Sequence, residues 1–292
     1  MDLRQLRYFV AVAEELSFSR AARKVHLSQP PLSRQVARLE QELGVQLLHR
    51  TTHEVSLSEA GTAFLAEARQ LLALSVRAGE AARRASRGET GLIRVGFIGS
   101  ALYSFLPALL RAYRQAYPDV QLALTQLTIA QQAEALRDRA IDVGVIRQAI
   151  VDDALVMRCV VKEPFVVAMP LDHPFAGRQK VALRSLAREP FVIFNRGDAP
   201  AIYDQTMRIC ERAGFSPRIV QEARPLATVV GLVATGLGVS IVPASTQRIN
   251  IDHVVYRPLV GTRAVSEFVL AWHRENRAPV LARFLALARQ LA

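Results

Sequence analysis

The chain has 292 residues, 51% of them hydrophobic, and its 37 basic and 26 acidic residues give a formal net charge of +11. This length allows two or three domains with buried cores, so the disordered and fibrous classes of protein are excluded. No run of eighteen uncharged apolar residues occurs, and Asp2 and Arg4 stand where the apolar part of a signal peptide would begin. We therefore expect a cytoplasmic protein with no membrane contact.

The positive charge is spread along the chain rather than gathered in one segment. Residues 1–58 carry eight basic and six acidic residues, whereas residues 91–292 carry 24 basic and 16 acidic ones. Charge alone therefore does not identify a nucleic-acid-binding segment, and a motif is needed for that. The excess in the second region suits either an anionic ligand or a diffuse cationic surface.

The first fifty residues have the spacing of three helices. Apolar residues at positions 3, 6, 9, 10 and 13 recur at three- and four-residue steps, and Ser19 is expected to cap a second helix over 19–25. Ser28 and the two prolines that follow Gln29 predict the start of a third helix. In this helix, apolar residues at positions 32, 36, 39 and 43 share one face, and Gly44 ends it.

Three helices with a tight turn before the third have the geometry that lays the third helix in the major groove of DNA. If the apolar stripe faces inward, the outward residues are Pro30, Arg34, Arg38 and Gln41. Arg34 can pair with guanine and Gln29 with adenine, whereas Ser33 and Thr51 can hold phosphate. The same shape also suits a three-helix interaction module whose polar face is only solvated.

Residues 45–57 alternate weakly, as a small hairpin or wing would, and a capping box from Ser56 to Glu59 follows. From there to about Arg87 no proline interrupts the chain, which predicts one long helix. Steps of four and three residues join Phe64, Ala68, Leu71, Ser75, Ala78, Ala82 and Ala85. This spacing is typical of a coiled-coil seam with small side chains, so we expect the helix to form a dimer; the alternative is packing on its own chain's core.

After Gly91 the pattern changes to short apolar runs with helical stretches between them. The expected strands cover 92–97, 120–124, 143–146, 165–169, 191–194, 238–242 and 268–272, and a terminal helix covers 279–291. This pattern predicts an α/β fold of two doubly wound lobes, with a ligand crevice at the carboxyl ends of their strands.

The segment from Phe18 to Ala37, FSRAARKVHLSQPPLSRQVA, followed by LEQELGVQLLHR and LSEAG, resembles the N-terminal domain of the LysR-type transcriptional regulators. The segments MDLRQLRYFVAVAEE, RVGFIGS, AIDVGVIR and VPAS extend the resemblance over the whole chain. They resemble the subgroup that controls catabolism of benzoate, catechol and chlorinated aromatics and senses muconate-type diacids.

The resemblance implies an α/β protein with an N-terminal all-α winged helix-turn-helix and a two-lobed effector domain of periplasmic-binding-protein type. It implies a homotetramer, dimerised through the linker helix, that binds operator DNA and a small organic acid, acts on RNA polymerase and uses no cofactor. The implied domains are 1–58 (winged helix-turn-helix), 59–88 (linker helix) and 91–292 (effector-binding). The first lobe would cover about 91–162 and 268–292, and the second about 163–267.

The resemblance also implies which residues bind DNA. They are Gln29, Pro30, Pro31, Ser33, Arg34 and Arg38 in the third helix, and Arg50, Thr51 and His53 in the wing. The proline pair can equally well serve only to start the helix.

Two turns carry groups suited to a carboxylate. Gly99-Ser100 follows a buried strand and precedes a helix that is expected to run through Tyr103 and Leu106, so free N–H groups and a hydroxyl converge there. Asn195-Arg196 repeats this arrangement after the strand over 191–194. Two facing anion sites suit a diacid, whereas Ser100 alone can be a plain helix cap.

The resemblance extends this set, and the expected effector-binding residues are Ser100, Thr128, Ile129, Arg147, Asn195, Arg196 and Tyr203. Muconate-responsive relatives tend to have glycine and threonine where this chain has Thr128 and Ile129, and chloroaromatic relatives carry threonine at the first position. This departure favours a small, more apolar, aromatic-derived acid over muconate itself.

Other functions need residues that do not stand out. A lyase of related two-lobed fold needs an acid–base pair in the cleft, and the six histidines have no metal-ligand spacing, so we expect no catalytic and no metal-binding residues. A redox sensor of the same family would need Cys159 and Cys210 as a switch. These lie 51 residues apart with no adjacent histidine, so we expect buried inert thiols.

Overall fold

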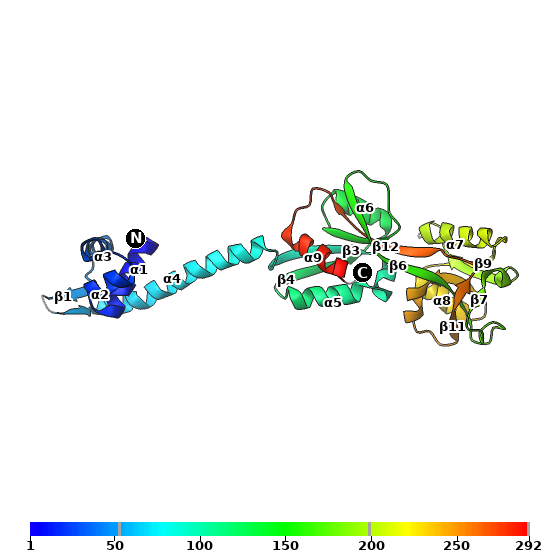
Figure 1. The fold of residues 1–292 in the computed structure, drawn as a ribbon, viewed down its shortest axis with the longest axis horizontal. Coiled ribbons are helices and arrows are strands. Elements are labelled where there is room, and N and C mark those ends of the chain that lie inside the picture. The colour runs from blue at the N-terminus through cyan, green and yellow to red at the C-terminus, as the bar shows by residue number, and fades with distance from the viewer. Residues whose placement is uncertain (52–53, 198–199, 291–292) are drawn as a thin grey trace. The chain divides into compact units, whose positions relative to one another are not determined.

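The computed structural model describes residues 1–51, 54–197 and 200–290 of the chain. They fall into two compact units, residues 1–84 and 85–292. Figure 1 labels the helices and strands of both units. Within the described residues, none of the helices combines the length and the apolar character needed to cross a membrane.

The N-terminal unit consists of three helices, a two-stranded wing and a long helix. Its elements are α1 (Leu3–Glu15), α2 (Phe18–Lys24), α3 (Gln29–Leu43), β1 (Leu48–Arg50), β2 (Val55–Leu57) and α4 (Glu59–Ser86). Leu32, Val36 and Leu39 are fully buried, so the apolar stripe of α3 faces the core as its spacing predicts. Gly44 ends α3 in the left-handed conformation (φ 69°), which glycine adopts without a steric penalty. The predicted helix-turn-helix fold is confirmed.

Two helix starts differ from the prediction. Ser17 rather than Ser19 caps α2 with its side chain. At the start of α4, the Ser58 hydroxyl accepts a hydrogen bond from the backbone N–H of residue 61 (2.9 Å), whereas Ser56 pairs within the wing. In both cases a second serine lies two positions away, and spacing alone does not decide between the two.

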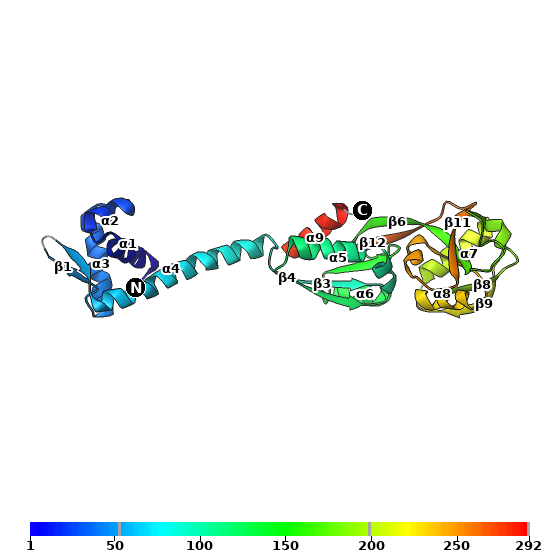
Figure 2. The ribbon, with the colours of Figure 1, turned by 90° about the horizontal axis from the view of Figure 1, so that it is seen from below.

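The first lobe of the C-terminal unit is a mixed sheet with helices on both faces, in which β12 is antiparallel to its neighbour β5. Its elements are β3 (Gly91–Phe97), η1 (Gly99–Tyr103), α5 (Leu106–Ala116), β4 (Val120–Gln126), α6 (Ile129–Arg137), β5 (Val143–Arg147), β12 (Val265–His273) and α9 (Pro279–Gln290). β3 lies between β4 and β5 and is parallel to both. Phe268 and Leu270 pack towards α5 and α9, whereas Val269 and Ala271 pack towards α6, so the helices lie on opposite faces (Figure 2).

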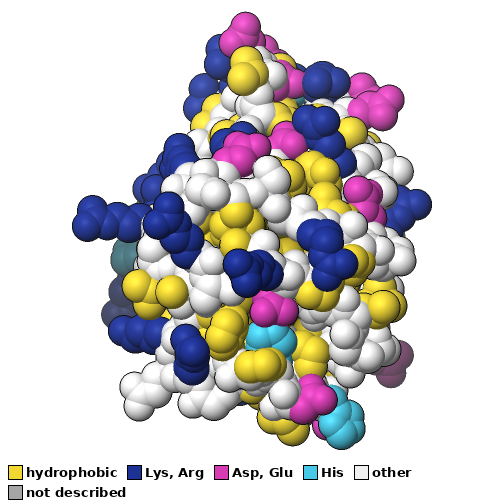
Figure 3. Space-filling view, turned by 90° about the vertical axis from the view of Figure 1, so that its right-hand side faces the viewer, with side chains coloured by type: hydrophobic (Ala, Val, Ile, Leu, Met, Phe, Trp, Pro, Cys, Tyr) yellow, Lys and Arg dark blue, Asp and Glu magenta, His cyan; other side chains and the backbone are white. Residues whose placement is uncertain are grey.

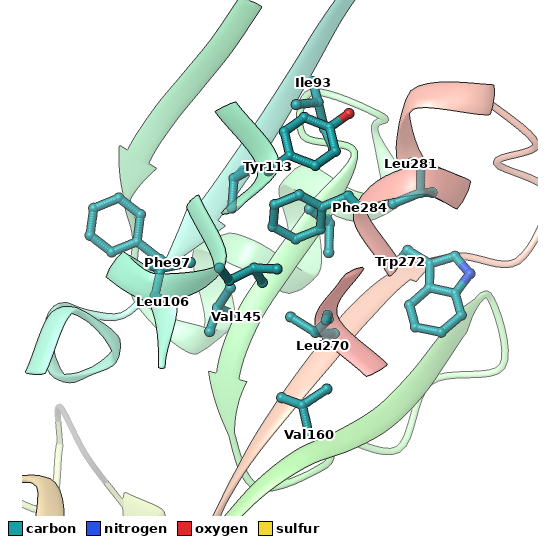
Figure 4. Packing of buried hydrophobic residues seen from close by; sticks show 14 of the residues in the cluster. Ile93, Phe97, Leu106, Tyr113, Val145, Val160, Leu270, Trp272, Leu281 and Phe284 are labelled. Carbon is teal, nitrogen blue, oxygen red and sulfur yellow. The ribbon is translucent and has the colours of Figure 1, made fainter. Parts of the chain in front are cut away.

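The core on the α5 and α9 face joins the two ends of this unit's sequence. Figure 4 shows Tyr113 beside Phe284, and the centroids of the two rings are 5.3 Å apart. The Tyr113 hydroxyl donates to the backbone carbonyl of Val280 (3.0 Å). The last helix of the chain therefore completes the first lobe.

The residues directly after α4 are fixed on the start of α9. Gly88 has φ 69°, and a Cβ placed on it would lie 2.5 Å from the carbonyl carbon of Pro279. The backbone carbonyl of Arg87 accepts a hydrogen bond from Nε of Arg283 (3.0 Å). Only glycine fits this close approach of two backbones.

The second lobe has the same layered plan. Its elements are β6 (Leu155–Pro170), β7 (Val181–Ala182), η2 (Leu183–Leu186), β8 (Pro190–Phe194), α7 (Pro200–Arg212), β9 (Arg218–Ala223), α8 (Leu226–Ala234), β10 (Ser240–Pro243), η3 (Ala244–Arg248) and β11 (Val254–Val260). β8 and β9 are parallel. Residues of α7 and α8 belong to separate core clusters that share β6 and β8, so the two helices cover opposite faces. The predicted two-lobed α/β architecture is confirmed.

β6 runs through both lobes. Its residues 155–164 pair with β12, and its residues 165–170 pair with β10 and β11. The sequence predicted only the second half, because Arg158, Lys162 and Glu163 interrupt the apolar pattern of the first half. β7, β9 and β11 were also not predicted; β9 is mostly exposed and lacks a buried run.

Candidate functional site

The outward face of α3 carries the residues expected to read DNA. Gln29, Pro30 and Arg34 are exposed, and Pro31 and Ser33 are half-buried. Arg34 forms no ion pair within the part of the chain that the structure describes, so its guanidinium is available to a ligand. Arg38 pairs with Glu42 across one helical turn (3.1 Å), but its side chain remains 70% exposed.

The start of α3 is tied to α2. The side-chain oxygen of Gln29 accepts a hydrogen bond from the Ser19 hydroxyl (2.9 Å), so the adenine contact expected of Gln29 shares its side chain with an internal bond. Ser28 precedes the helix without a capping hydrogen bond from its side chain, and the two prolines lie in the first turn. Prolines are tolerated there because the first N–H groups of a helix have no intrahelical partner.

The wing residues are differently placed. Arg50 pairs with Glu40 (Nη2 to Oε2, 2.6 Å) and lies over the ring of Phe18 at 4.9 Å. Thr51 is exposed, and its hydroxyl accepts a hydrogen bond from the backbone N–H of Glu54 (3.0 Å). His53 lies outside the described residues.

The carboxyl ends of three neighbouring parallel strands carry polar residues in the first lobe. Ser100 follows β3, Thr128 follows β4, and Arg147 ends β5. β3 is hydrogen-bonded to both other strands, so these ends lie at one edge of the sheet. In α/β folds, ligands bind outside this edge.

Ser100 does not begin a helix that runs through Tyr103 and Leu106, as was expected. Residues 99–103 form a 3₁₀ turn, and α5 starts afresh at Leu106 with Pro107 in its first turn. Proline favours a first-turn position because it has no N–H to donate, so the helix begins here rather than at Ser100. The Ser100 hydroxyl instead accepts a hydrogen bond from Nε of Arg147 (3.2 Å).

Thr128 caps α6, and Ile129 is the first residue of that helix. The Thr128 hydroxyl accepts from the N–H of Gln131 (3.3 Å), and the Gln131 side chain accepts from the N–H of Thr128 (2.9 Å). Thr128 is exposed and Ile129 half-buried. This capping box leaves the N–H groups of the first two helical residues without an intrahelical partner, so the N-terminus of α6 is electropositive.

Arg147 is the cation at this edge, and it is only 4% exposed. Its Nη2 lies 2.8 Å from Oε1 of Glu163, it donates to the Ser266 hydroxyl, and its guanidinium lies 3.9 Å from the centre of the Phe268 ring. Burial lowers the pKa of Arg147 below its ordinary value, and the carboxylate of Glu163 opposes that shift. The pair therefore neutralises a charge that burial disfavours.

Glu163 was not predicted as part of the site. Its two carboxylate oxygens accept hydrogen bonds from the backbone N–H (2.6 Å) and the hydroxyl (3.0 Å) of Ser245, at the start of η3 in the second lobe. The network thus runs from Ser100 in the first lobe through Arg147 and Glu163 to the second lobe. A glutamate inside the apolar run from 160 to 170 is the signal in the sequence that points to a buried partner.

The second-lobe residues expected to bind an anion have partners within their own lobe. The Asn195 amide donates to Glu222 (2.9 Å), and its oxygen accepts from the N–H of Gly197 (2.9 Å). Arg196 pairs with Asp204 (3.0 Å), and its guanidinium lies 5.8 Å from the centre of the half-buried Tyr203 ring. Neighbouring acids of the same lobe therefore already engage the polar ends of Asn195 and Arg196.

The two lobes touch where their short 3₁₀ turns meet. Nη1 of Arg248, at the end of η3, donates to the carbonyls of Tyr103 (3.3 Å) and Ser104 (2.7 Å). Tyr103 also packs against a core cluster of the second lobe. The strand ends that precede η1 and η3, those of β3 and β10, therefore face each other across the junction of the lobes.

Within the part of the chain that the structure describes, the thiols and histidines form no cluster suited to redox or metal chemistry. Cys159 is exposed and Cys210 is buried, contrary to the expectation that both are buried. Burial raises the pKa of the Cys210 thiol to about 12. Partial desolvation of the sulfur raises the pKa of the more exposed Cys159 above its ordinary value. Both shifts disfavour a reactive thiolate. Within the described ranges, no group of three or more His, Cys, Asp or Glu side chains could hold a metal ion.

On one face of the second lobe, the surface charge is dispersed. Figure 3 looks onto the end at which α7, β7 and β9 lie in Figure 1, and shows basic side chains scattered over this face with acidic ones between them. On this face the positive charge forms no single patch. It has the character of a diffuse cationic surface.

Comparison with known proteins gives matches over both units. Residues 3–62 match the model for the bacterial regulatory helix-turn-helix protein, lysR family, and residues 86–292 match that for the LysR substrate binding domain. The HTH-type transcriptional regulator AlsR of Bacillus subtilis (strain 168) is 39% identical over 289 residues, which cover 99% of this chain and 95% of AlsR.

Two solved structures of relatives contain a bound partner, DNA in one and an effector in the other. Full-length CbnR in complex with its target DNA is 33% identical, has a TM-score of 0.87, and is matched over 100% of this chain and 99% of that chain. The BenM effector binding domain with its effector benzoate is 30% identical, has a TM-score of 0.64, and is matched over 69% of this chain and 91% of that chain.

Proposed function

The chain belongs to the LysR family of DNA-binding transcriptional regulators, and on this basis we propose that it responds to a small organic acid bound between the lobes of its C-terminal unit. The observation that carries this proposal is the meeting of Ser100, Thr128 and Arg147 at the carboxyl ends of three adjacent parallel strands. A carboxylate at this edge would be stabilised by the Ser100 hydroxyl and by the N–H groups at the start of α6. Arg147, paired with Glu163, donates to the Ser100 oxygen from behind the site and so leaves the Ser100 proton free for a carboxylate.

The effector is proposed to be an aromatic-derived acid, and the regulated genes those for degrading aromatic compounds. Ile129 places an apolar side chain next to the Thr128 cap, which suits a ligand with an apolar body. The benzoate bound to the related BenM domain supports this class of ligand. Because Asn195 and Arg196 are engaged within the second lobe, this arrangement favours an acid whose charged end meets the first lobe.

Assembly is proposed to occur through α4. Leu71 and Leu74 are 40% and 54% exposed, and Ala78 and Ala82 are also exposed, so an apolar stripe is left uncovered. Phe64 and Ala68 belong instead to the core of the N-terminal unit, so the seam begins after them. We propose a dimer along this stripe, a homotetramer as the assembled form, and RNA polymerase as the partner in activation.

The chain is proposed to act by binding rather than by catalysis. Arg147 and Glu163 are the charged groups buried at the proposed site, and they neutralise each other, which leaves no free acid or base there. The raised pKa values of both thiols argue against the redox-sensor alternative.

Calorimetric titration with benzoate, salicylate, muconate and chloromuconate tests the effector site. Ser100→Ala with Thr128→Val removes a hydroxyl proposed to hold the carboxylate and the side-chain cap of α6. It should weaken binding by about tenfold or more, because a hydrogen bond to a charged group contributes about 1.5–3 kcal/mol. The control Ser216→Ala removes an exposed hydroxyl of the second lobe and should bind as the wild type does. Operator binding should survive in both variants. Undiminished affinity in the double variant would place the effector elsewhere, and no binding of any of the four acids to the wild type would remove the aromatic assignment.

Light scattering tests the α4 seam. Ala78→Glu with Ala82→Glu should reduce the assembly to smaller species and abolish operator binding, because two half-sites must be held at a fixed spacing. The control Ala66→Glu with Ala73→Glu places the same charges on exposed positions away from the seam and should leave the size unchanged. Equal sizes for the two double variants would show that the seam is misplaced.

A further inference from the structure

The side chain of Glu40 joins the recognition helix α3 to the first strand of the wing. Its Oε1 accepts hydrogen bonds from the backbone N–H groups of Leu47 (2.9 Å) and Leu48 (3.0 Å), and its Oε2 accepts one from Nη2 of Arg50 (2.6 Å). The Glu40 side chain is only 13% exposed. Charge-assisted hydrogen bonds shielded in this way are stronger than those between neutral groups. One carboxylate thus holds three donors of the wing segment.

The guanidinium of Arg50 has a second contact, with an aromatic ring. The group lies 4.9 Å from the centre of the Phe18 ring, at the start of α2, and Phe18 is itself 8% exposed. The guanidinium therefore contacts both a carboxylate of α3 and a ring of α2. Both contacts restrict the side chain, which is 29% exposed.

The wing needs such an anchor because its own ladder is short. β1 and β2 pair over three residues each, from Leu48 opposite Leu57 to Arg50 opposite Val55. A two-stranded hairpin of this size is at best marginally stable alone. Its angle to α3 must therefore come from contacts with the helices, and Glu40 supplies polar contacts to both ends of β1.

The two arginines of α3 lack this arrangement. Arg38 pairs with Glu42 of the same helix, but the two side chains are 70% and 32% exposed, and exposed pairs of this kind contribute little. Arg34 forms no ion pair within the described residues. Arg50 therefore differs from both arginines in having an ion pair with a half-buried carboxylate and a contact with an aromatic ring.

We propose that Glu40 and Arg50 form a clamp that sets the position of the wing against the recognition helix, and that Arg50 supports DNA binding through this clamp rather than by contacting DNA. Glu40 and Arg50 are thus positioning residues. This inference is independent of the effector and depends only on the winged helix-turn-helix and its DNA binding.

The direction in which one substitution changes the affinity for DNA distinguishes the clamp from a direct contact of Arg50 with DNA. Glu40→Gln removes a negative charge from the DNA-binding unit, which by electrostatics alone should strengthen binding to the DNA polyanion. The clamp predicts the reverse, a loss of about 10- to 100-fold, because charge-assisted bonds are lost. Glu42→Gln is the matched control: it removes the same charge from an exposed pair of the same helix and should bind as tightly as the wild type or more tightly.

Affinities are measured by fluorescence anisotropy on a duplex that the full-length wild-type chain selects from a random-sequence pool, over a series of salt concentrations. Arg50→Ala should lose a similar factor to Glu40→Gln, and adding Arg50→Ala to Glu40→Gln should cost less than about twofold more. Arg50→Lys keeps the charge but not the planar fork, so it should also weaken binding. The slope of log affinity against log salt should match the wild type in the doubly substituted chain, whose net charge is unchanged.

A phosphate contact by Arg50 would overturn the proposal, and it has a distinct signature. The salt slope would fall by about one on Arg50→Ala in either background, Arg50→Lys would bind nearly normally, and Glu40→Gln would bind as tightly as Glu42→Gln. Hydrogen exchange of the DNA-free chains provides the structural readout. Faster exchange of the amides of residues 47–50 in Glu40→Gln, with α1 unchanged, supports the clamp, whereas faster exchange throughout residues 1–84 contradicts it.

Discussion

In the N-terminal unit, Arg34 projects from α3 with no ion pair in the described part of the chain, whereas in the C-terminal unit Arg147 is 4% exposed and bonded to Glu163, Ser100 and Ser266. The first arrangement is ready for a large polyanion, which can be bound without breaking a bond inside the protein. The second already has partners inside the protein, so a small acid must rearrange existing bonds to bind Arg147 itself. We therefore expect the N-terminal unit to bind DNA with a preformed surface, whereas a direct contact of an acid with Arg147 would need an exchange of partners.

The causes of the shifted pKa values also differ between the two units. The shifted pKa values in the N-terminal unit belong to exposed groups such as Glu14 and Glu42, whose carboxyl pKa values are lowered by hydrogen bonds from basic groups. In the C-terminal unit, burial raises the pKa values of Tyr113, Cys210 and Tyr256 to about 12. Alkaline conditions should therefore act first on the C-terminal unit.

The largest effect is expected from breaking the buried pair. Glu163→Ala leaves Arg147 as a buried charge without a carboxylate, and should lower the free energy of unfolding of the C-terminal unit by about 3–5 kcal/mol. The control Glu267→Ala removes the partner of the exposed Lys162 and should cost at most about 1 kcal/mol. Urea unfolding followed by fluorescence of Trp272, the only tryptophan, reports on this unit. Similar losses of unfolding free energy in the two variants would mean that the burial of Arg147 does not determine the size of the effect.

A smaller effect is expected on the preformed surface. Arg34→Ala should weaken binding to a specific duplex by about 1–3 kcal/mol, because an arginine paired with a base edge contributes that much discrimination. It should leave the size of the assembly and the binding of a scrambled duplex nearly unchanged. A mobility-shift titration measures this, with Arg289→Ala in α9 as a control for loss of one charge. Equal loss on both duplexes would show that Arg34 contacts phosphate instead.

The smallest effect concerns alkaline pH. The pKa of Tyr113 is about 12 in the folded chain, above its ordinary value of 10.0, so its contribution to stability is fully present below pH 10 and is lost as the pH rises towards 12. Tyr113→Phe should remove about 1 kcal/mol of the stability loss between pH 9 and 11, as measured by Trp272 fluorescence. Tyr8→Phe in the N-terminal unit should leave that loss as it is. An unchanged pH profile for Tyr113→Phe would exclude this tyrosine as a cause.

Local patterns in the sequence predicted the elements that bury one continuous apolar face. The stripe at Leu32, Val36 and Leu39 and the stop at Gly44 were enough for α3, and the apolar run at 143–146 was enough for β5. The pattern failed where exposure or charge interrupts it, as in β9 and in the first half of β6 with Arg158 and Glu163. Which of two nearby serines caps a helix, as with Ser56 and Ser58 before α4, depends on which hydroxyl lies at the first turn of the helix. Spacing in the sequence does not decide it.

The sites were less predictable than the fold because side chains find partners far away in the sequence. Arg147 was placed at the proposed effector edge, but its partner Glu163 is brought there by strand pairing between β5, β12 and β6. Arg50 was expected to contact DNA, and its bond to Glu40 depends on how the wing folds back on α3. Pairs of this kind follow from tertiary structure, and a single sequence does not show them.

The contact of Gly88 and Arg87 with α9 bears on how sensors of this type are rebuilt by protein engineering. A chimera that joins a foreign DNA-binding half to this sensor keeps the contact intact if the crossover lies before Ala85, within the helix. A crossover after Gly88 would place a foreign residue at position 88, and any residue other than glycine there would bring a Cβ against Pro279. The cassette that can be exchanged is therefore residues 1–84, and the sensor module begins at Ala85.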